Sequence, residues 1–176
     1  MTCIVAVELE GKVYMGGDSA AASGWDIHVI DFKKVFRNGE FLIGYTTSFR
    51  MGQLLEHELT VPKQETESDI HYMITKFVPA IRELFKTAGF TKIDSNKEEG
   101  GLFLVGYKGK VYRVDSDFQI LRHTGGLYAI GCGYAYALGS LMTNVSSNTE
   151  QKIITALEVT GIFSNGVCAP YYVVTQ

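Results

Sequence analysis

The sequence predicts an α+β fold in which two antiparallel sheets carry their helices on their outer faces. Two groups of strand-like segments joined by hairpin turns occur, in residues 2–43 and in residues 102–112. Each group is followed by segments with the apolar spacing of amphipathic helices, and a last β-branched segment closes the chain at residues 171–175. Runs of strands followed by runs of helices are typical of antiparallel sheets with segregated helices.

The composition is that of one globular domain with a well-filled core. The chain has 176 residues, of which 46% are hydrophobic and 20% are charged, and only 3 are prolines. Since this length suits one compact unit, we expect residues 1–176 to form a single domain. Any larger assembly would then come from further copies or partners.

Charge and hydropathy argue against several classes of function. The formal net charge of −3 gives no basic excess that would indicate nucleic acid or a membrane as a partner. No apolar run approaches the ~20 residues of a membrane span, and the N-terminus lacks the pattern of a signal peptide, so we expect a cytoplasmic protein. The 3 cysteines show no C-x-x-C spacing and are expected to be reduced thiols.

The first strands are predicted to form a hairpin that places two polar residues near the N-terminus. Residues 2–9 are mostly apolar, as in a strand covered on both faces, and Glu10-Gly11 forms a turn before residues 12–15. Pairing about this turn places Thr2 opposite Asp18-Ser19, within one residue of register. The start of the chain therefore lies inside the fold.

The remaining elements follow from turn and capping signals. Pro79 interrupts the second helical segment, so we expect a kink or a restart there. The polar stretch at residues 92–99 is expected to be a surface loop or an insertion. The other predicted strands are at residues 27–30, 32–36, 41–43 and 127–130, and a further hairpin turns about Lys108-Gly109. The predicted helices are at 49–59, from a Thr66-x-x-Asp69 capping box to Gly89, at 134–142, and from a Ser147-x-x-Glu150 capping box to Gly161.

Motifs of common enzyme classes do not occur in the sequence. It contains no G-x-S-x-G elbow, no phosphate-binding G-x-x-x-x-G-K-[ST] loop, no H-E-x-x-H helix and no pair of C-x-x-C motifs. The 4 histidines are scattered without ligand spacing. A metal enzyme or a histidine-based triad is therefore poorly supported.

Thr2 is a candidate nucleophile because it directly follows the initiator methionine. Methionine is normally trimmed before a small residue, which would leave a threonine with both a hydroxyl and a free α-amine. The hydroxyl is a poor nucleophile by itself, but an α-amine with a pKa of ~7.7–8.0 can act as its base. A nearby positive charge would keep that amine neutral at working pH.

Lys34 is the candidate for that positive charge. Alternation places it between Phe32 and Phe36 on one apolar face, where a lysine needs a carboxylate partner to stay charged. Asp18, expected close to Thr2, is the natural partner. Thr2, Asp18 and Lys34 also have ordinary interpretations, as a second residue, a turn residue and a strand lysine whose end reaches solvent. Spacing alone leaves the functional and the ordinary interpretation open.

These residues lie in a pattern that resembles the proteasome β-type and HslV-like peptidase subunits. The resemblance covers nearly the whole chain and needs no gap between Thr2 and Val35. Its matching segments are residues 2–7, Gly16-Gly17-Asp18, Gly24, Lys33-Lys34-Val35, the glycine-rich turn at 129–135 and the penultimate helix at 156–161.

The resemblance implies a four-layer αββα sandwich of the N-terminal nucleophile hydrolase type. It implies that Thr2 is the nucleophile, its amine the base, Lys34 the charge that tunes the amine and Asp18 the group that orients Lys34. A backbone N–H around Thr47 or Ser48 would hold the oxyanion, with Thr46 lining the same turn. Such subunits assemble into rings of stacked hexamers or heptamers, work with an AAA+ unfoldase ATPase and cut peptides or unfolded proteins.

The sequence also departs from the family's pattern. Cys132 stands where a serine is usual, and a thiol is the weaker hydrogen-bonding group, so Cys132 either takes part in proton transfer less well or only packs. Threonines and a serine replace the glycines after Gly44 and would narrow the cleft. No cofactor is implied, apart from a candidate Na⁺ held by carbonyls of Gly161, Ser164 and Val167.

Two other functions remain open at this stage. A ring or scaffold protein that retains Met1 would be inactive, because a blocked amine cannot act as a base. An amidase of the same nucleophile class would act on a small molecule in the narrowed cleft. Threonine-type endopeptidase activity is the function that we expect from the sequence.

Overall fold

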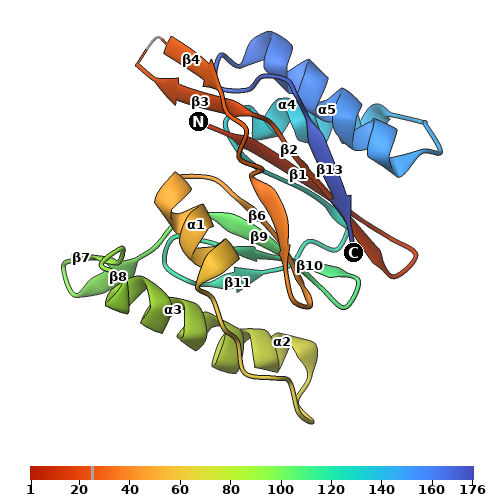
Figure 1. Ribbon diagram of the computed structural model, residues 1–176. Helices are drawn as coiled ribbons and strands as arrows, with labels where there is room; N and C mark the ends of the chain where they lie inside the picture. The colour runs from red at the N-terminus through yellow and green to blue at the C-terminus, as the bar shows by residue number, and fades with distance from the viewer. Residues whose placement is uncertain (25) are drawn as a thin grey trace.

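The computed structural model describes residues 1–24 and 26–176, which build two large antiparallel sheets and two small ones (Figure 1). The first large sheet has the order β12-β1-β2-β13, made of β1 (Cys3–Leu9), β2 (Lys12–Gly17), β12 (Leu127–Gly131) and β13 (Tyr172–Thr175). The second has the order β11-β10-β9-β6-β5, made of β5 (Val35–Asn38), β6 (Phe41–Tyr45), β9 (Phe103–Tyr107), β10 (Lys110–Val114) and β11 (Ile120–Leu121). The small sheets pair β3 (Ala20–Ser23) with β4 (Asp26–Val29), and β7 (Lys92–Asp94) with β8 (Lys97–Glu99).

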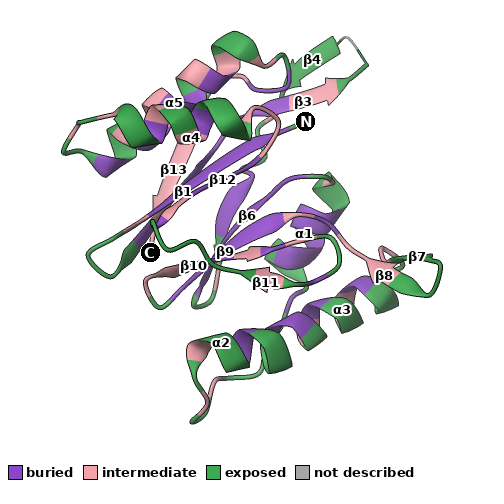
Figure 2. Ribbon diagram, turned by 180° about the vertical axis from the view of Figure 1, so that it is seen from behind, coloured by how far each residue is buried: buried purple, intermediate pink, exposed green. Residues whose placement is uncertain are grey.

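The helices pack on the faces of the two large sheets that point away from each other (Figures 1 and 2). Helices α4 (Tyr134–Thr143) and α5 (Thr149–Phe163) cover the first sheet. The second sheet is covered by α1 (Phe49–His57), α2 (Asp69–Tyr72), the π-helix η1 (Met73–Phe77) and α3 (Val78–Thr87). The predicted combination of antiparallel sheets with helices is therefore confirmed. No helix of residues 1–24 and 26–176 is long and apolar enough to cross a membrane.

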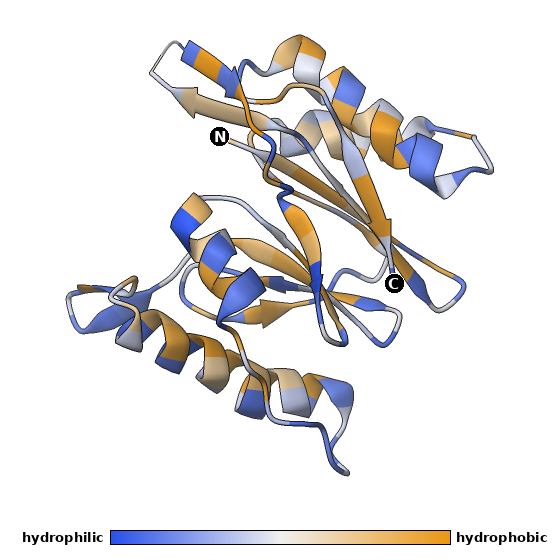
Figure 3. Ribbon diagram, in the orientation of Figure 1, coloured by the Kyte–Doolittle hydropathy of each residue, from blue (hydrophilic) through white to orange (hydrophobic). Residues whose placement is uncertain are grey.

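Strand β1 is apolar throughout most of its length because both of its faces are buried (Figure 3). Ile4 and Ala6 belong to the cluster between the two large sheets, where they meet side chains such as Leu42 of β6. Cys3 and Val5 point the other way, into the cluster formed with α4 and α5. Since nothing polar interrupts its first five residues, β1 is held between apolar layers up to its first residue.

The predicted first hairpin is confirmed, together with its register. Ile4 pairs with Gly17 across β1 and β2, which places Asp18 next to the start of β1. The glycines here allow close packing on both faces: a Cβ on Gly16 would lie 2.4 Å from Ile153 of α5, and one on Gly17 would lie 2.9 Å from Ile4. This tight packing fixes the backbone that carries Asp18.

Two predicted segments differ in the structure. Strand β5 begins at Val35 rather than at residue 32, and Phe32 is 61% exposed, so the predicted apolar face with Phe32 on one side of Lys34 is wrong. Residues 92–99 form the exposed hairpin of β7 and β8 rather than a loop. Its turn places Ser95 and Asn96 at φ 50° and 66°, the left-handed pair typical of tight hairpins.

Helix boundaries also shift from the predicted capping residues. Ser68 rather than Thr66 is the N-cap of α2, and Asn148 rather than Ser147 is the N-cap of α5, where its side chain accepts from the Gln151 N–H. The predicted interruption near Pro79 is confirmed, because the π-helix η1 ends at Phe77, two residues before the proline, and α3 restarts at Val78. Proline cannot donate the intrahelical hydrogen bond, so the turns before it are rearranged.

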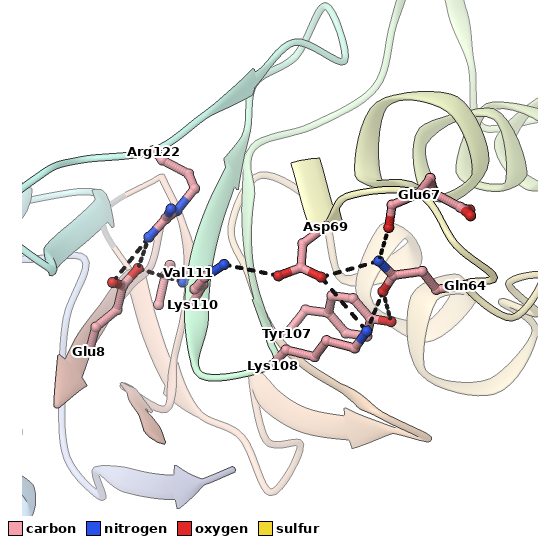
Figure 4. Close-up of polar contacts among 9 residues, drawn as sticks. All are labelled: Glu8, Gln64, Glu67, Asp69, Tyr107, Lys108, Lys110, Val111 and Arg122. Atoms are coloured by element: carbon pink, nitrogen blue, oxygen red, sulfur yellow. Dashed lines mark hydrogen bonds and ion pairs between the residues drawn. The ribbon is translucent and has the colours of Figure 1, made fainter. Parts of the chain in front are cut away.

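One polar network joins the two large sheets, and a second one fixes α2 against the second sheet (Figure 4). Glu8 at the end of β1 accepts hydrogen bonds from the Val111 N–H, at 2.6 Å, and from Arg122, and so joins the two large sheets. Asp69 at the start of α2 accepts from Lys110, at 2.9 Å, and from Gln64, which fixes α2 against β10. The Glu8 contacts lie at the end of β1 that is opposite Thr2.

Candidate active site

Asp18 and Lys34 form a buried ion pair at the start of β1. Their side chains are fully buried, and the Lys34 Nζ lies 3.1 and 3.0 Å from the two carboxylate oxygens of Asp18. The third donor of the ammonium reaches the Ala20 carbonyl at 2.6 Å. All three donors of Lys34 therefore have acceptors, as a buried charge requires.

The backbone next to Thr2 completes the coordination of the Asp18 carboxylate. Asp18 Oδ1 accepts from the Cys3 N–H at 2.9 Å, and Oδ2 accepts from the Ala20 N–H at 2.8 Å. The carboxylate thus joins the residue that follows Thr2 to the ammonium of Lys34. The structure brings together Thr2, Asp18 and Lys34, as the sequence predicted.

Burial lowers the pKa of Lys34 below its usual range, and the attraction of Asp18 opposes this shift. The ion pair keeps the ammonium stable where an isolated lysine would lose its proton. A site that must hold a positive charge in a dry environment needs both partners, because removing the carboxylate leaves the desolvation of the ammonium uncompensated.

Thr2 is almost fully buried, at 6% exposure, whereas Met1 is 48% exposed. The Thr2 hydroxyl donates to the Met1 carbonyl at 2.6 Å. The Met1 side chain lies over Gly166, where an added Cβ would come within 2.4 Å of it. With Met1 in place, the Thr2 nitrogen is an amide and cannot act as a base.

Cys132 lies beside Thr2, directly after the neighbouring strand. Its N–H donates to the Thr2 carbonyl at 2.7 Å, at the point where β12 has ended at Gly131. Its side chain packs against the cluster that contains Cys3. The structure therefore places Cys132 with Thr2, Asp18 and Lys34.

The predicted oxyanion residues form the turn between β6 and α1. Thr47 adopts a left-handed backbone with φ 68°, and the Ser48 N–H donates back to the Thr46 carbonyl at 2.7 Å. Ser48 is also the N-cap of α1. The Thr47 N–H has no hydrogen-bond acceptor among the residues that the structure describes, which makes it the free donor of this turn.

Two adjoining cavities lie at this turn. A small one of about 20 Å³ is lined by Thr2 together with Tyr45, Phe49 and the Thr46–Ser48 turn. Tyr45 and Phe49 also line a larger pocket of about 550 Å³, whose walls include Ile30, Phe32 and Arg50. The larger pocket is lined mainly by apolar surface, with charged side chains among its walls.

The three residues of the predicted cation site lie around the turn that ends α5. Ser164 is the C-cap of α5, and its carbonyl accepts from the Val167 N–H at 3.2 Å. A Cβ on Gly161 would lie 3.3 Å from the Val167 carbonyl oxygen. The three residues are thus close together in the structure. Within the described part of the chain, no group of three or more His, Cys, Asp and Glu side chains could hold a metal ion.

Two contributions to the site carried no clear sequence signal. Ala20 supplies both a carbonyl for Lys34 and an N–H for Asp18, but any residue could supply these backbone groups. Leu102 bonds to the turn at Thr47 across 55 residues of sequence, and no local pattern reports such a contact. Backbone partners of this kind become visible only in the folded chain.

The buried first strand, the almost buried second residue and the buried Asp–Lys pair lie in a fold that the chain shares with solved proteasome-like peptidase subunits. No protein-family model matches the sequence, and no curated protein matches it.

The structural similarity extends over the whole chain. It covers 99% of this chain and 98% of BPH from Thiobacillus denitrificans in complex with epoxomicin, with a TM-score of 0.78 and 16% identity. It covers 99% of this chain and 98% of HslV from Trypanosoma brucei, with a TM-score of 0.69 and 20% identity. The helical assembly of Anbu from Pseudomonas aeruginosa gives a TM-score of 0.68 at 16% identity, over 99% of this chain and 81% of that one. The resemblance that the sequence predicted is confirmed at the level of the fold.

Proposed function

We propose that the chain is a threonine-type endopeptidase whose nucleophile is the hydroxyl of Thr2 after removal of Met1. The observation that carries this proposal is the buried Asp18–Lys34 pair, which is hydrogen-bonded to the backbone N–H directly after Thr2. An ion pair inside a core is costly to form and is often replaceable by apolar residues without loss of stability. A catalytic site that needs a fixed positive charge would explain why this ion pair is present.

The chemistry follows from the groups in the site. The free α-amine of Thr2, with an ordinary pKa of ~7.7–8.0, takes the hydroxyl proton as the oxygen attacks a peptide carbonyl. The unpaired N–H of Thr47 holds the oxyanion. The protonated α-amine then gives its proton to the leaving amine, which leaves an ester on Thr2. Water, deprotonated by the same α-amine, hydrolyses that ester and restores the hydroxyl.

Other parts of the site have roles in the same proposal. The charge of Lys34 favours the neutral form of the amine, and Asp18 orients Lys34. Cys132, whose backbone N–H donates to the Thr2 carbonyl, would contact the freed amine through its thiol. The 550 Å³ pocket beside Tyr45 and Phe49 receives a substrate side chain. Carbonyls of Gly161, Ser164 and Val167 would hold a structural Na⁺.

We extend the proposal to the assembly. Residues 1–176 form one domain whose two sheets and outer helices make up a four-layer αββα sandwich. Copies of it enclose the site in a ring of stacked hexamers or heptamers in the cytoplasm, to which an AAA+ unfoldase delivers unfolded chains. The similarity to HslV and to the helically assembled Anbu protein supports assembly into an oligomer.

The test is peptide hydrolysis by a chain whose first residue is Thr2. A cleavable N-terminal fusion exposes Thr2, intact-protein mass verifies it, and fluorogenic peptides report turnover. We expect turnover by the exposed form and none by Thr2→Ala, whereas Thr143→Ala, at an exposed threonine of α4, keeps it. Epoxomicin, the compound bound to BPH, should block turnover.

Other results would point to the alternative functions. Activity in preparations that retain Met1, or activity of Thr2→Ala equal to that of Thr143→Ala, would eliminate the threonine mechanism. An inert exposed form would support a scaffold. Turnover of small amides without turnover of peptides would support an amidase.

A further inference from the structure

The turn between β6 and α1 contains a threonine in a conformation that threonine rarely adopts. Thr47 has φ 68°, in the left-handed region, where a β-branched side chain crowds its own backbone. Glycine is the residue that takes this conformation freely. A threonine here needs contacts that hold it in place, and the structure provides them.

Those contacts form a closed ring of hydrogen bonds. The Leu102 N–H donates to Thr47 Oγ1 at 3.2 Å, and Thr46 Oγ1 donates to the Leu102 carbonyl at 2.9 Å. The two threonine hydroxyls lie 3.2 Å apart. Because Thr46 uses its only proton on the carbonyl, Thr47 must donate to Thr46, so every donor in the ring has one acceptor.

The segment before β9 also provides room for the Thr47 side chain. A Cβ on Gly101 would lie 3.3 Å from the Thr47 Cβ and 2.4 Å from the sulfur of Met51. A glycine at 101 therefore leaves room for Met51 of α1 and for the Cβ of Thr47. The Thr46 N–H donates to the Leu102 carbonyl as well, at 3.1 Å, so the turn is bound to this segment through its backbone and its side chains.

We propose that Thr47 is a positioning residue: its hydroxyl, bonded to the Leu102 backbone, holds the left-handed turn that presents the Thr47 N–H to the oxyanion. The inference rests on the proposed peptidase function and assigns the side chain a task within it. Thr47 and Thr2 line the same small cavity, so a change in the turn acts next to the nucleophile. The neighbouring Ser48 N–H cannot substitute, because it is already bonded to Thr46.

Variants at position 47 separate the hydroxyl from the backbone conformation. Thr47→Val keeps the shape but leaves Leu102 without its acceptor, Thr47→Ser keeps the acceptor, and Thr47→Gly takes the left-handed conformation without help. Loss of one oxyanion donor lowers kcat by about 10²–10³-fold in well-studied enzymes. We expect Thr47→Val to lose about 10- to 100-fold in kcat with little change in KM, and Thr47→Ser and Thr47→Gly to stay within a few-fold of the parent.

The matched control is Thr87→Val, at an exposed threonine of α3 whose hydroxyl donates to carbonyls of its own helix. A kcat for Thr47→Val equal to that of the control would overturn the proposal. So would an equal loss in Thr47→Gly and Thr47→Val, because the hydroxyl itself would then be required. Thr47→Ala, which also lacks the hydroxyl, replaces Thr47→Val in these comparisons should the valine variant fail to fold.

A second readout does not depend on turnover. Amide hydrogen exchange at Leu102 should be faster in Thr47→Val than in the parent and in Thr47→Ser, because the valine variant lacks the acceptor that the other two keep. Unchanged exchange in Thr47→Val would overturn the ring of hydrogen bonds. If the parent with exposed Thr2 cleaves no peptide, the proposed function fails, while the exchange experiment still decides whether Thr47 holds the turn.

Discussion

Replacing Asp18 by asparagine tests the buried ion pair, on which the proposed function depends. The asparagine side chain can still accept one backbone hydrogen bond, but it leaves the Lys34 ammonium with neutral acceptors, the Ala20 carbonyl and the amide, in place of a carboxylate. Removing one partner of a buried ion pair destabilises proteins by about 3–5 kcal/mol. With a slope of about 3 kcal/mol per M in urea, the unfolding midpoint should fall by roughly 1–2 M.

The assay is urea unfolding at a fixed protein concentration, with the same substitution at an exposed ion pair as its control. Asp94 lies 3.9 Å from Lys92, and both side chains are more than half exposed. Such surface pairs contribute about 0–1 kcal/mol, so Asp94→Asn should barely move the midpoint. Lys34→Met added to Asp18→Asn should recover part of the loss, because no charge then stays buried. Equal midpoints for Asp18→Asn and Asp94→Asn would refute the reasoning.

Three further predictions concern the site and the core. Lys34→Ala in the exposed-Thr2 form should abolish peptide turnover while sedimentation shows an unchanged assembly; dissociation with full activity would contradict this. Cys132→Ser should raise kcat, since a hydroxyl is the stronger hydrogen-bonding group, and an unchanged kcat would assign Cys132 to packing. Burial raises the pKa of Tyr45, Tyr72 and Tyr112 to about 12. The stability that depends on these neutral phenols is complete below pH ~10 and is lost as the pH rises toward 12, so tyrosinate absorbance and loss of circular dichroism should rise together.

Local patterns were sufficient to predict the first hairpin and its consequence for the site. The two-residue turn at Glu10-Gly11 fixes the register of β1 and β2, and that register brings Asp18 next to the start of β1. The apolar run of β1 predicts burial on both faces, which the clusters on its two sides confirm. Short-range turn chemistry and periodicity determine both features, so the sequence alone could predict them.

The surroundings of Lys34 could not be predicted in the same way. Alternation placed Phe32 beside it in a strand, but the chain bends there and strand pairing starts only at Val35, and Phe32 lines the large pocket instead. Lys34 is buried because its carbonyl pairs with the Tyr45 N–H at 3.1 Å and its side chain reaches Ala20. The first contact continues the pairing of β5 with β6, whereas the second joins Lys34 to a segment outside the second sheet, which local periodicity does not report.

A chain terminus usually frays, yet a catalytic α-amine has to be fixed to within a fraction of an ångström. Here β1 is an inner strand, paired with β2 on one side and β12 on the other, so its first residues have hydrogen-bond partners on both edges. The Cys132 N–H holds the Thr2 carbonyl, and Asp18 holds the N–H of Cys3. The same carboxylate fixes Lys34, so strand order and ion pair together position Thr2, the proposed nucleophile, and the charge of Lys34. Substitutions that loosen β12 at Gly131 should therefore disturb the site as much as those in Asp18, because a Cβ there would lie 2.1 Å from the Thr2 carbonyl oxygen.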